Sequence, residues 1–291
     1  MPMPSWHVSL AAAKRLALRF PGVTGVDYGY KYHSGARSSR LCVRFHVAHK
    51  LPLEALRPHE VLPADLGSIA CDVLQARYAP RAAPHSRPGA GALGAIVRDA
   101  GSGRLCLLSN WHVLCGGAGA RRGESVFRPG EARPGTGPAR AIAALERWIN
   151  PKQGCDAAIA VLSAEMRHAD AFADIGVRIS GLEEPRLGLA LQGSGAAPLN
   201  QALVDGIEGM YELDFGAYGD QKHWMNGFRL VPDPQHGQDA IGMGGDSGAI
   251  WINRETRRAV ALNFASNDSA GAGSAVAHPL SRIFELLNLA F

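Results

Sequence analysis

From residue 92 onward, short apolar runs alternate with turn residues, and this pattern limits the possible folds most strongly. Leu93–Val97 and Leu105–Ser109 flank Asp99–Gly103, as the two strands of a hairpin flank its turn. Further runs of this kind are Ser125–Phe127, Ala139–Leu145, Ala157–Leu162, Val177–Ile179, Leu187–Leu191, Gly227–Val231, Ala249–Ile252 and Ala259–Phe264. With 35 glycines among 291 residues, the chain is predicted to be a mainly β sandwich or barrel.

Helical periodicity is confined to the two ends of the chain. Near the N-terminus, apolar residues recur at steps of four and three on one helical face: Trp6, Leu10, Ala13, Ala17 and Phe20. A second stripe follows Pro279 and predicts a C-terminal helix: Leu280, Ile283, Phe284, Leu287 and Leu289.

Residues 1–78 are predicted to form a small α+β domain with a regulatory or structural role. After the first helix, strands are expected at Val26–Tyr32, Leu41–Val47 and Ala70–Leu74, with a short helix at Leu53–Leu56. In Leu41–Val47 the odd-numbered apolar residues are expected to face inward. His46 then falls on the polar face, where it is expected to be solvated. A metal site at His46 and His49 is not predicted because no third ligand is placed.

A basic, proline-rich linker at residues 79–91 separates this domain from a second one at residues 92–291. Gly89–Gly94 matches the G-x-G-x-x-G pattern of dinucleotide-binding folds. The match is rejected because it follows a linker and runs into a β-type segment, whereas the nucleotide site needs a strand before it and a helix after it.

The charge and the cysteine content narrow the partners and the cellular location that the chain can have. Thirty basic against 26 acidic residues give a formal net charge of +4, without a block of like charge. We therefore expect no nucleic-acid or membrane partner. The five cysteines lack C-x-x-C spacing, and the N-terminus lacks a signal-peptide pattern. These observations predict a cytoplasmic protein with reduced cysteines and no cofactor or metal.

Gly242–Trp251 places a serine, Ser247, in a glycine-rich turn ahead of an apolar run. Glycines let consecutive backbone N–H groups point at one spot, which is what a serine nucleophile needs for its oxyanion. The same residues also suit an ordinary β-turn. The serine needs a matching base and acid before the catalytic interpretation is favoured.

Two further residues supply that match. His112 follows an apolar strand in Ser109–Leu114, and Asp156 stands at the head of the apolar run Ala157–Leu162. Taken singly, each suits a packed loop residue as well as a catalytic one. The order His112, Asp156, Ser247 and the spacing between them favour a catalytic set.

This set resembles the chymotrypsin-like serine peptidases, which carry their triad in this order. The resemblance covers roughly residues 90–290 and implies a double β-barrel with a C-terminal helix. Four segments further resemble the cytosolic trypsin-like peptidases of bacteria and the plant narrow-leaf type, which place a small α/β domain ahead of the protease: Gly25–Tyr30, Ser109–Leu114, Gly245–Trp251 and Leu262–Ala265. Gly193–Ala197 departs from these relatives, which tend to show a Thr-Thr-Gly core.

The resemblance implies a role for each matching residue. His112 is the general base, Asp156 orients it, and Ser247 is the nucleophile. The backbone N–H groups of Gly245 and Ser247 form the oxyanion hole. The counterpart of Asp246 in secreted relatives pairs with a new N-terminus made by cleavage. No such start is found near residue 90, so Asp246 is expected to have an internal partner.

Specificity follows from the same resemblance. The S1 pocket is expected at Ile241, Asn263, Phe264 and Ala265. Ile241 is apolar where a trypsin-like pocket needs an acidic floor, so an apolar or small P1 residue is favoured.

The sequence as a whole predicts a serine endopeptidase acting on protein or peptide substrates, with a regulatory partner binding through residues 1–78. Two alternatives stay open. One is a non-catalytic scaffold or binding protein that retains the protease fold, and the other is a serine esterase with the same machinery.

Overall fold

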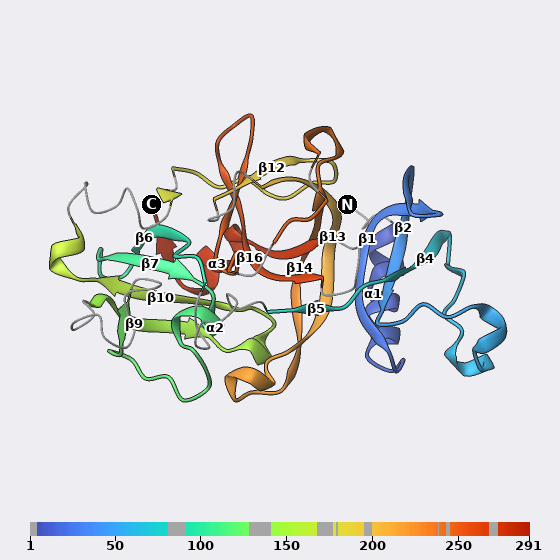
Figure 1. The fold of residues 1–291 in the computed structure, drawn as a ribbon, viewed down its shortest axis with the longest axis horizontal. Coiled ribbons are helices and arrows are strands. Elements are labelled where there is room, and N and C mark those ends of the chain that lie inside the picture. Colours follow the sequence, from blue (N-terminus) through green and yellow to red (C-terminus); the bar gives the residue numbers. More distant parts are fainter. Residues whose placement is uncertain are drawn as a thin grey trace.

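The chain folds into two β-sheets with few helices, as the computed structural model shows (Figure 1). The structure describes residues 5–80, 91–127, 141–167, 177–178, 180–194, 200–237, 239–242, 245–267 and 273–291. The predicted fold class is confirmed in that the chain is mainly β, with a small α+β unit in front and a helix near the C-terminus. Most of the predicted linker, residues 81–90, lies outside the described residues.

A seven-stranded sheet contains the first half of the predicted β region, in the order β11-β6-β7-β10-β9-β8 with β18 added beside β6. Its strands are β6 Ala95–Asp99, β7 Leu105–Ser109, β8 Ser125–Phe127, β9 Ala141–Ile149, β10 Ala157–Leu162, β11 Val177–Arg178 and β18 Leu289–Ala290. The predicted hairpin is present, because β6 and β7 pair antiparallel. Residues 139, 140 and 179 of the predicted strands lie outside the described residues.

An eleven-stranded sheet contains the rest, in the order β12-β15-β16-β17-β14-β13-β1-β2-β4-β3 with β5 beside β16. Its C-terminal members are β12 Ala190–Gly193, β13 Gln201–Asp214, β14 Lys222–Pro232, β15 Ile250–Asn253, β16 Ala259–Asn267 and β17 Ala275–Pro279. Its N-terminal members are β1 Val23–His33, β2 Ala36–Val47, β3 Asp65–Leu66, β4 Ile69–Gln75 and β5 Tyr78–Ala79. Because β1 pairs antiparallel with β13, the N-terminal strands continue the same sheet.

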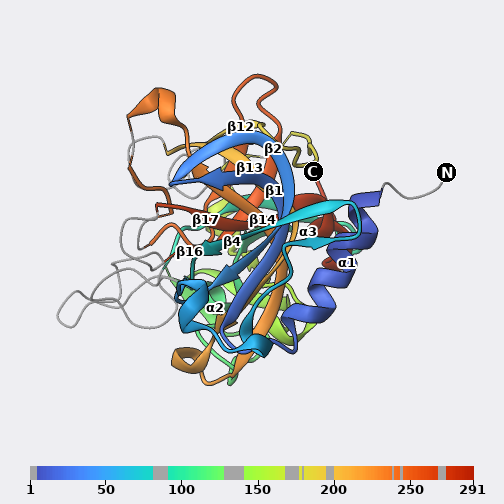
Figure 2. The same cartoon turned by 90° about the vertical axis from the view of Figure 1, so that its right-hand side faces the viewer.

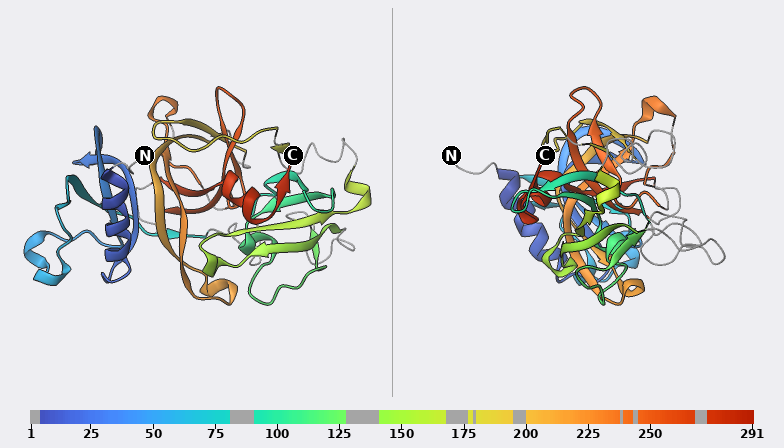
Figure 3. Two further views of the ribbon diagram at one scale, coloured as in Figure 1. Left: turned by 180° about the vertical axis from the view of Figure 1, so that it is seen from behind. Right: turned by 90° about the vertical axis from the view of Figure 1, so that its left-hand side faces the viewer.

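The two longer helices pack against the sheets in different ways, the first on β1 and β2 and the second in a core shared by both sheets. Helix α1, Ser5–Ala17, lies beside β1 and β2 (Figure 2). Its residues Leu10 and Ala13 share one core with Val26, Val43 and Phe45. Helix α3, Leu280–Leu286, lies beside β16 and β17, and the chain then adds β18 to the other sheet (Figure 3). None of the described helices combines the length and hydrophobicity that a membrane crossing requires.

Shorter helical turns connect the strands. They are η1 Leu53–Ala55, η2 Pro58–Glu60, α2 Trp111–Leu114, η3 Pro151–Gln153, η4 Ala164–Arg167, η6 Gly216–Tyr218 and η7 Pro234–His236.

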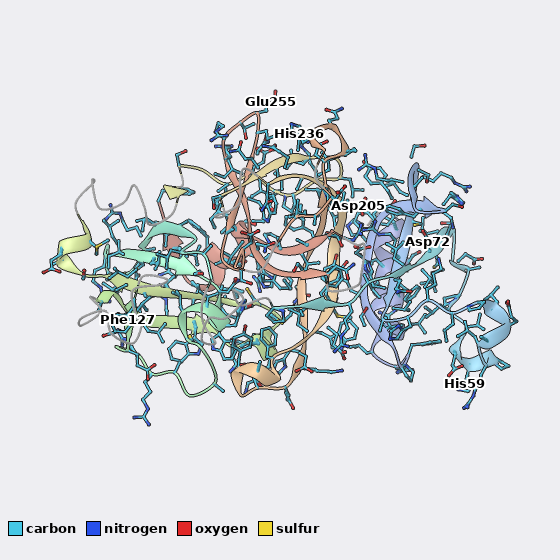
Figure 4. All side chains as sticks on the ribbon, in the orientation of Figure 1. His59, Asp72, Phe127, Asp205, His236 and Glu255 are labelled. Carbon is cyan, nitrogen blue, oxygen red and sulfur yellow. The ribbon has the colours of Figure 1, made fainter. Side chains whose placement is uncertain are left out.

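The orientation predicted for β2 holds for Val43 and Phe45, which are buried, but is wrong for Leu41 and His46. Leu41 is 41% exposed, whereas His46, expected to be solvated, is fully buried together with Arg44. The polar face of β2 turns inward because its charged groups pair with those of neighbouring strands. Arg44 binds Asp27 of β1 and Asp205 of β13 (Figure 4 labels Asp205), at 2.6 Å from an oxygen of each carboxylate.

Candidate active site

The pairing of β7 with β10 brings His112 and Asp156 together. His112 lies in the one-turn helix α2 directly after β7, and Asp156 immediately precedes β10. In the antiparallel register Ala158 faces Ser109, so the end of β7 and the start of β10 are neighbours. Both side chains are fully buried.

Asp156 holds His112 through two hydrogen bonds. The ring Nδ1 lies 2.5 Å from Asp156 Oδ2, and the backbone N–H of His112 donates to Oδ1 at 3.1 Å. A carboxylate can only accept, so Nδ1 carries the proton and Nε2 is left as the acceptor. Nε2 is buried and has no hydrogen-bond partner among the described residues. The ring is therefore oriented with a basic nitrogen available.

Ser247 lies in a turn that requires glycine at two positions. Gly245 and Gly248 have φ of 101° and 91°, which residues with a side chain rarely adopt. A Cβ at Gly248 would lie 2.2 Å from Ser109 Oγ. Gly245 and Ser247, the predicted oxyanion donors, are both described, whereas Met243 and Gly244 lie outside the described residues.

Gly91 links the serine turn to the histidine helix. A Cβ on this residue would lie 2.6 Å both from Ser247 O and from Val113 Cγ2, and Val113 directly follows His112. The next residue, Ala92, donates its N–H to Ser247 O at 2.7 Å. Gly91 therefore lies between the serine turn and Val113, the residue that follows His112.

Asp246 has an internal partner in this fold. Asn200 Nδ2 donates to Asp246 Oδ2 at 3.0 Å, and Asn263 Nδ2 donates to the backbone oxygen of Asp246 at 3.2 Å. Asp246 is 4% exposed. Its carboxylate therefore accepts a hydrogen bond from Asn200, which directly precedes β13, and sequence reasoning did not identify Asn200 as the donor.

The four residues assigned to the S1 pocket are all buried, and the three apolar ones are divided between two cores. Ile241 packs with Leu191 and Trp251, whereas Phe264 and Ala265 pack with Trp111. Asn263 joins the serine turn through Asp246. Their role in substrate recognition stays a prediction. Of Gly193–Ala197, only Gly193 and Ser194 are described.

Aromatic residues after β13 enclose the histidine, and the sequence offered no signal for them. The rings of Tyr218 and His112 lie 5.2 Å apart between centroids, and Phe215 packs edge-on to Trp111. Burial, with a smaller effect from the charge of Asp156, raises the pKa of Tyr218 to about 12. Tyr218 is therefore neutral at physiological pH and contributes an apolar wall.

A second buried histidine, His278 of β17, lies behind Asp156. Its Nε2 accepts the backbone N–H of Asp156 at 3.0 Å. Burial lowers the pKa of His278 to about 4, against the attraction of Asp156. Asn110 Nδ2 donates to the backbone oxygen of Asp156 at 2.8 Å. Together with the two bonds from His112, these contacts occupy the backbone N–H, the backbone oxygen and both carboxylate oxygens of Asp156.

Of the known proteins compared with this chain, only solved structures are similar to it. No protein-family model and no curated protein sequence matches the chain. A glutamic acid specific serine protease aligns with 67% of this chain and 89% of its own, at 18% identity and a TM-score of 0.45. Thermobifida fusca protease A covers 72% of this chain and 94% of its own, at 14% identity and TM-score 0.44.

Cellulomonas bogoriensis chymotrypsin covers 70% of this chain and 97% of its own, at 14% identity and TM-score 0.44. These structural neighbours are serine proteases of the chymotrypsin type. Their TM-scores are below 0.5, so we infer function from the residues of the site itself.

Proposed function

We propose that this chain is a serine endopeptidase that hydrolyses peptide bonds through His112, Asp156 and Ser247. The observation that carries the proposal is the buried His112–Asp156 pair, in which Asp156 takes Nδ1 and Nε2 has no partner among the described residues. A second support is Gly91, which lies between the glycine-bounded serine turn and Val113, the residue after His112. A base without a nucleophile, or a nucleophile without a base, would not support this reading.

The reaction follows from these positions. Ser247 Oγ attacks the substrate carbonyl carbon while its proton moves to His112 Nε2. Asp156 stabilises the imidazolium that results. When the tetrahedral intermediate collapses, the C–N bond breaks and the proton passes from Nε2 to the leaving amine. Water then attacks the acyl-enzyme by the same route, with His112 as base, and Ser247 regains its proton.

The negative charge on the substrate oxygen is assigned to the N–H groups of Gly245 and Ser247. The positive φ of Gly245 supports this assignment, because it lets the backbone N–H of Gly245 point toward the nucleophile. One donor of this kind contributes about 3 kcal/mol to transition-state stabilisation.

The bond between Asn200 and Asp246 supports an enzyme that needs no activating cleavage. An internal amide here supplies a partner that a new N-terminus would otherwise provide. We extend the proposal to a cytoplasmic location, supported by five cysteines that are all free. An apolar or small P1 residue and a regulatory role for residues 1–78 complete it.

Peptide-library cleavage read by mass spectrometry tests the proposal. The wild-type chain should cleave a subset of peptides and reveal the P1 preference, and Ser247→Ala should release no products. A folded wild-type chain that cleaves nothing across the library would overturn the proposal in favour of the non-catalytic scaffold. Cleavage of ester but not peptide substrates would favour the esterase.

A further inference from the structure

His278 and Asn226 form a bridge from the eleven-stranded sheet to the loop that carries Asp156. Asn226 of β14 donates its backbone N–H to Gly154 O at 2.8 Å and accepts a hydrogen bond from His278 Nδ1 at 2.5 Å. His278 Nε2 then accepts the N–H of Asp156 at 3.0 Å. The segment from Gly154 to Asp156 is thus held at both of its ends by two residues of the other sheet.

The two bonds of His278 fix its protonation state. A backbone N–H can only donate, so Nε2 must carry no proton. A backbone carbonyl can only accept, so Nδ1 must carry one. Both partners therefore require the same neutral tautomer. A second proton on Nε2 would face the N–H of Asp156 and break the bridge.

The surroundings of the bridge are built to keep it in place. The His278 ring stacks on Phe264 of β16, with centroids 3.9 Å apart and planes 14° apart. Gly154 has φ of 77°, and a Cβ there would lie 2.4 Å from Asn226 Nδ2. The charged or titratable groups that act on His278 are Asp156, which favours its protonation, and His112, which opposes it.

The bridge joins the two parts of the triad. His112 and Asp156 adjoin β7 and β10 of the seven-stranded sheet, whereas Ser247 lies shortly before β15 of the sheet that carries His278. We propose that His278 is a positioning residue, which, in its neutral form, holds Asp156 and through it His112 in register with Ser247. This inference rests on the proposed function for its catalytic effect, but the geometry it predicts can be measured separately.

Two amide variants separate the bonds of His278. In His278→Gln the side-chain oxygen can reach the Nε2 position and still accept from Asp156. In His278→Asn the side chain reaches only the Nδ1 position, so the bond to Asn226 can persist while that to Asp156 is lost. Val43→Ala, in the separate core under α1, is the control for lowered stability without contact to the bridge.

Steady-state kinetics and the NMR resonance of the His112 Nδ1 proton are then compared across the variants. We expect His278→Asn to lower kcat about 10- to 100-fold with KM nearly unchanged, since a misplacement of about 1 Å can have an effect of that size. It should also shift the Nδ1 resonance. His278→Gln should restore most of kcat and the resonance, and Val43→Ala should alter neither.

If His278→Asn keeps the wild-type kcat and resonance, the positioning role is wrong. The role is also wrong if Val43→Ala reproduces the kinetic loss, because lowered stability alone then explains it. If the wild type cleaves no substrate while His278→Asn still shifts the resonance, the proposed function fails but the positioning of His112 through Asp156 stands.

Discussion

The described residues include two buried aspartate–histidine pairs, and their neighbours give them opposite characters. In the first, Asp156 binds His112 at 2.5 Å, and none of the hydrogen bonds found to Asp156 in the described structure comes from arginine or lysine. In the second, His46 Nε2 lies 3.3 Å from Asp27 Oδ2 without the alignment of a hydrogen bond. Here Arg44 binds both oxygens of Asp27.

Charge balance explains the difference. Asp27 and Asp205 are matched by two arginines, Arg44 and Arg229, in one buried cluster between β1, β2, β13 and β14. Burial alone would raise the pKa of Asp27, but the charges of Arg44 and His46 outweigh it and hold that pKa below its usual range. The carboxylate charge is thus neutralised within the cluster. Asp156 accepts no hydrogen bond from an arginine or lysine among the described residues, so its charge remains available for an imidazolium.

The largest expected effect is on catalysis, from Asp156→Asn. The amide would present a donor or a weaker acceptor to His112 and favour the wrong tautomer, so kcat should fall about 10⁴-fold. Stopped assays with active-site titration measure this directly. A loss of less than about tenfold would remove Asp156 from the mechanism.

Arg44→Met should act on stability and leave kcat unchanged. Removing this guanidinium leaves Asp27 and Asp205 buried with Arg229 as their remaining arginine, and breaking a buried pair costs about 3–5 kcal/mol. Urea unfolding followed by fluorescence gives the free energy of unfolding. Active-site titration gives the concentration of active enzyme, from which kcat per active molecule is calculated. A fall in kcat without a loss of stability would contradict the structural role of the cluster.

Lowering the pH should weaken the fold in a window set by His278. Its folded pKa of about 4 lies below the ordinary value of 6.5, so between these values the unfolded chain binds a proton that the folded chain does not. The free energy of unfolding should therefore fall as the pH drops through this window, by up to about 3 kcal/mol.

His278→Gln provides the comparison for this window, because glutamine does not titrate. Below about pH 4, Asp27 and Asp205 lower the free energy of unfolding further in both proteins. Their pKa values are lower in the folded state than in the unfolded state, so the stability that they contribute is lost as the pH falls below the unfolded pKa. Identical pH dependence of wild type and His278→Gln between pH 6.5 and 4 would show that His278 does not contribute.

The smallest effect is expected from Asn200→Leu. The substitution removes a donor to Asp246 and should lower the free energy of unfolding by about 1–3 kcal/mol. Because Asp246 adjoins Ser247, kcat/KM should fall about tenfold. Asn200→Asp, nearly identical in shape, should cost more because two carboxylates would face each other. Equal effects of the two substitutions would argue against a direct bond.

The sequence predicts local features well and non-local ones poorly. Strand boundaries around His112 and Asp156 follow from short apolar runs, and β7 and β10 have the predicted ends. The pairing of β1 with β13 could not be predicted, because β13 contains glycines that weaken a strand pattern. One of them has a packing reason, since a Cβ at Gly206 would lie 1.9 Å from Arg44 Nη2.

The same limit applies to the candidate site. His112, Asp156 and Ser247 carry recognisable neighbours in sequence, whereas His278 is an isolated histidine before Pro279. The prediction that His46 is solvated rests on alternation along the strand, which assumes that one face of the strand contacts water. That assumption fails where charged groups of one strand pair with those of another, and such pairing is not visible from the strand alone.

Fluorophosphonate labelling with mass-spectrometric site assignment tests the central claim most directly. The reagent forms a bond to Ser247 Oγ and releases fluoride only when a neighbouring base activates the serine. We predict a single label on Ser247 in the wild type and in Arg44→Met, strongly slowed labelling in Asp156→Asn, and none in Ser247→Ala. A folded wild-type protein that stays unlabelled, or carries the label on another serine, would contradict the account.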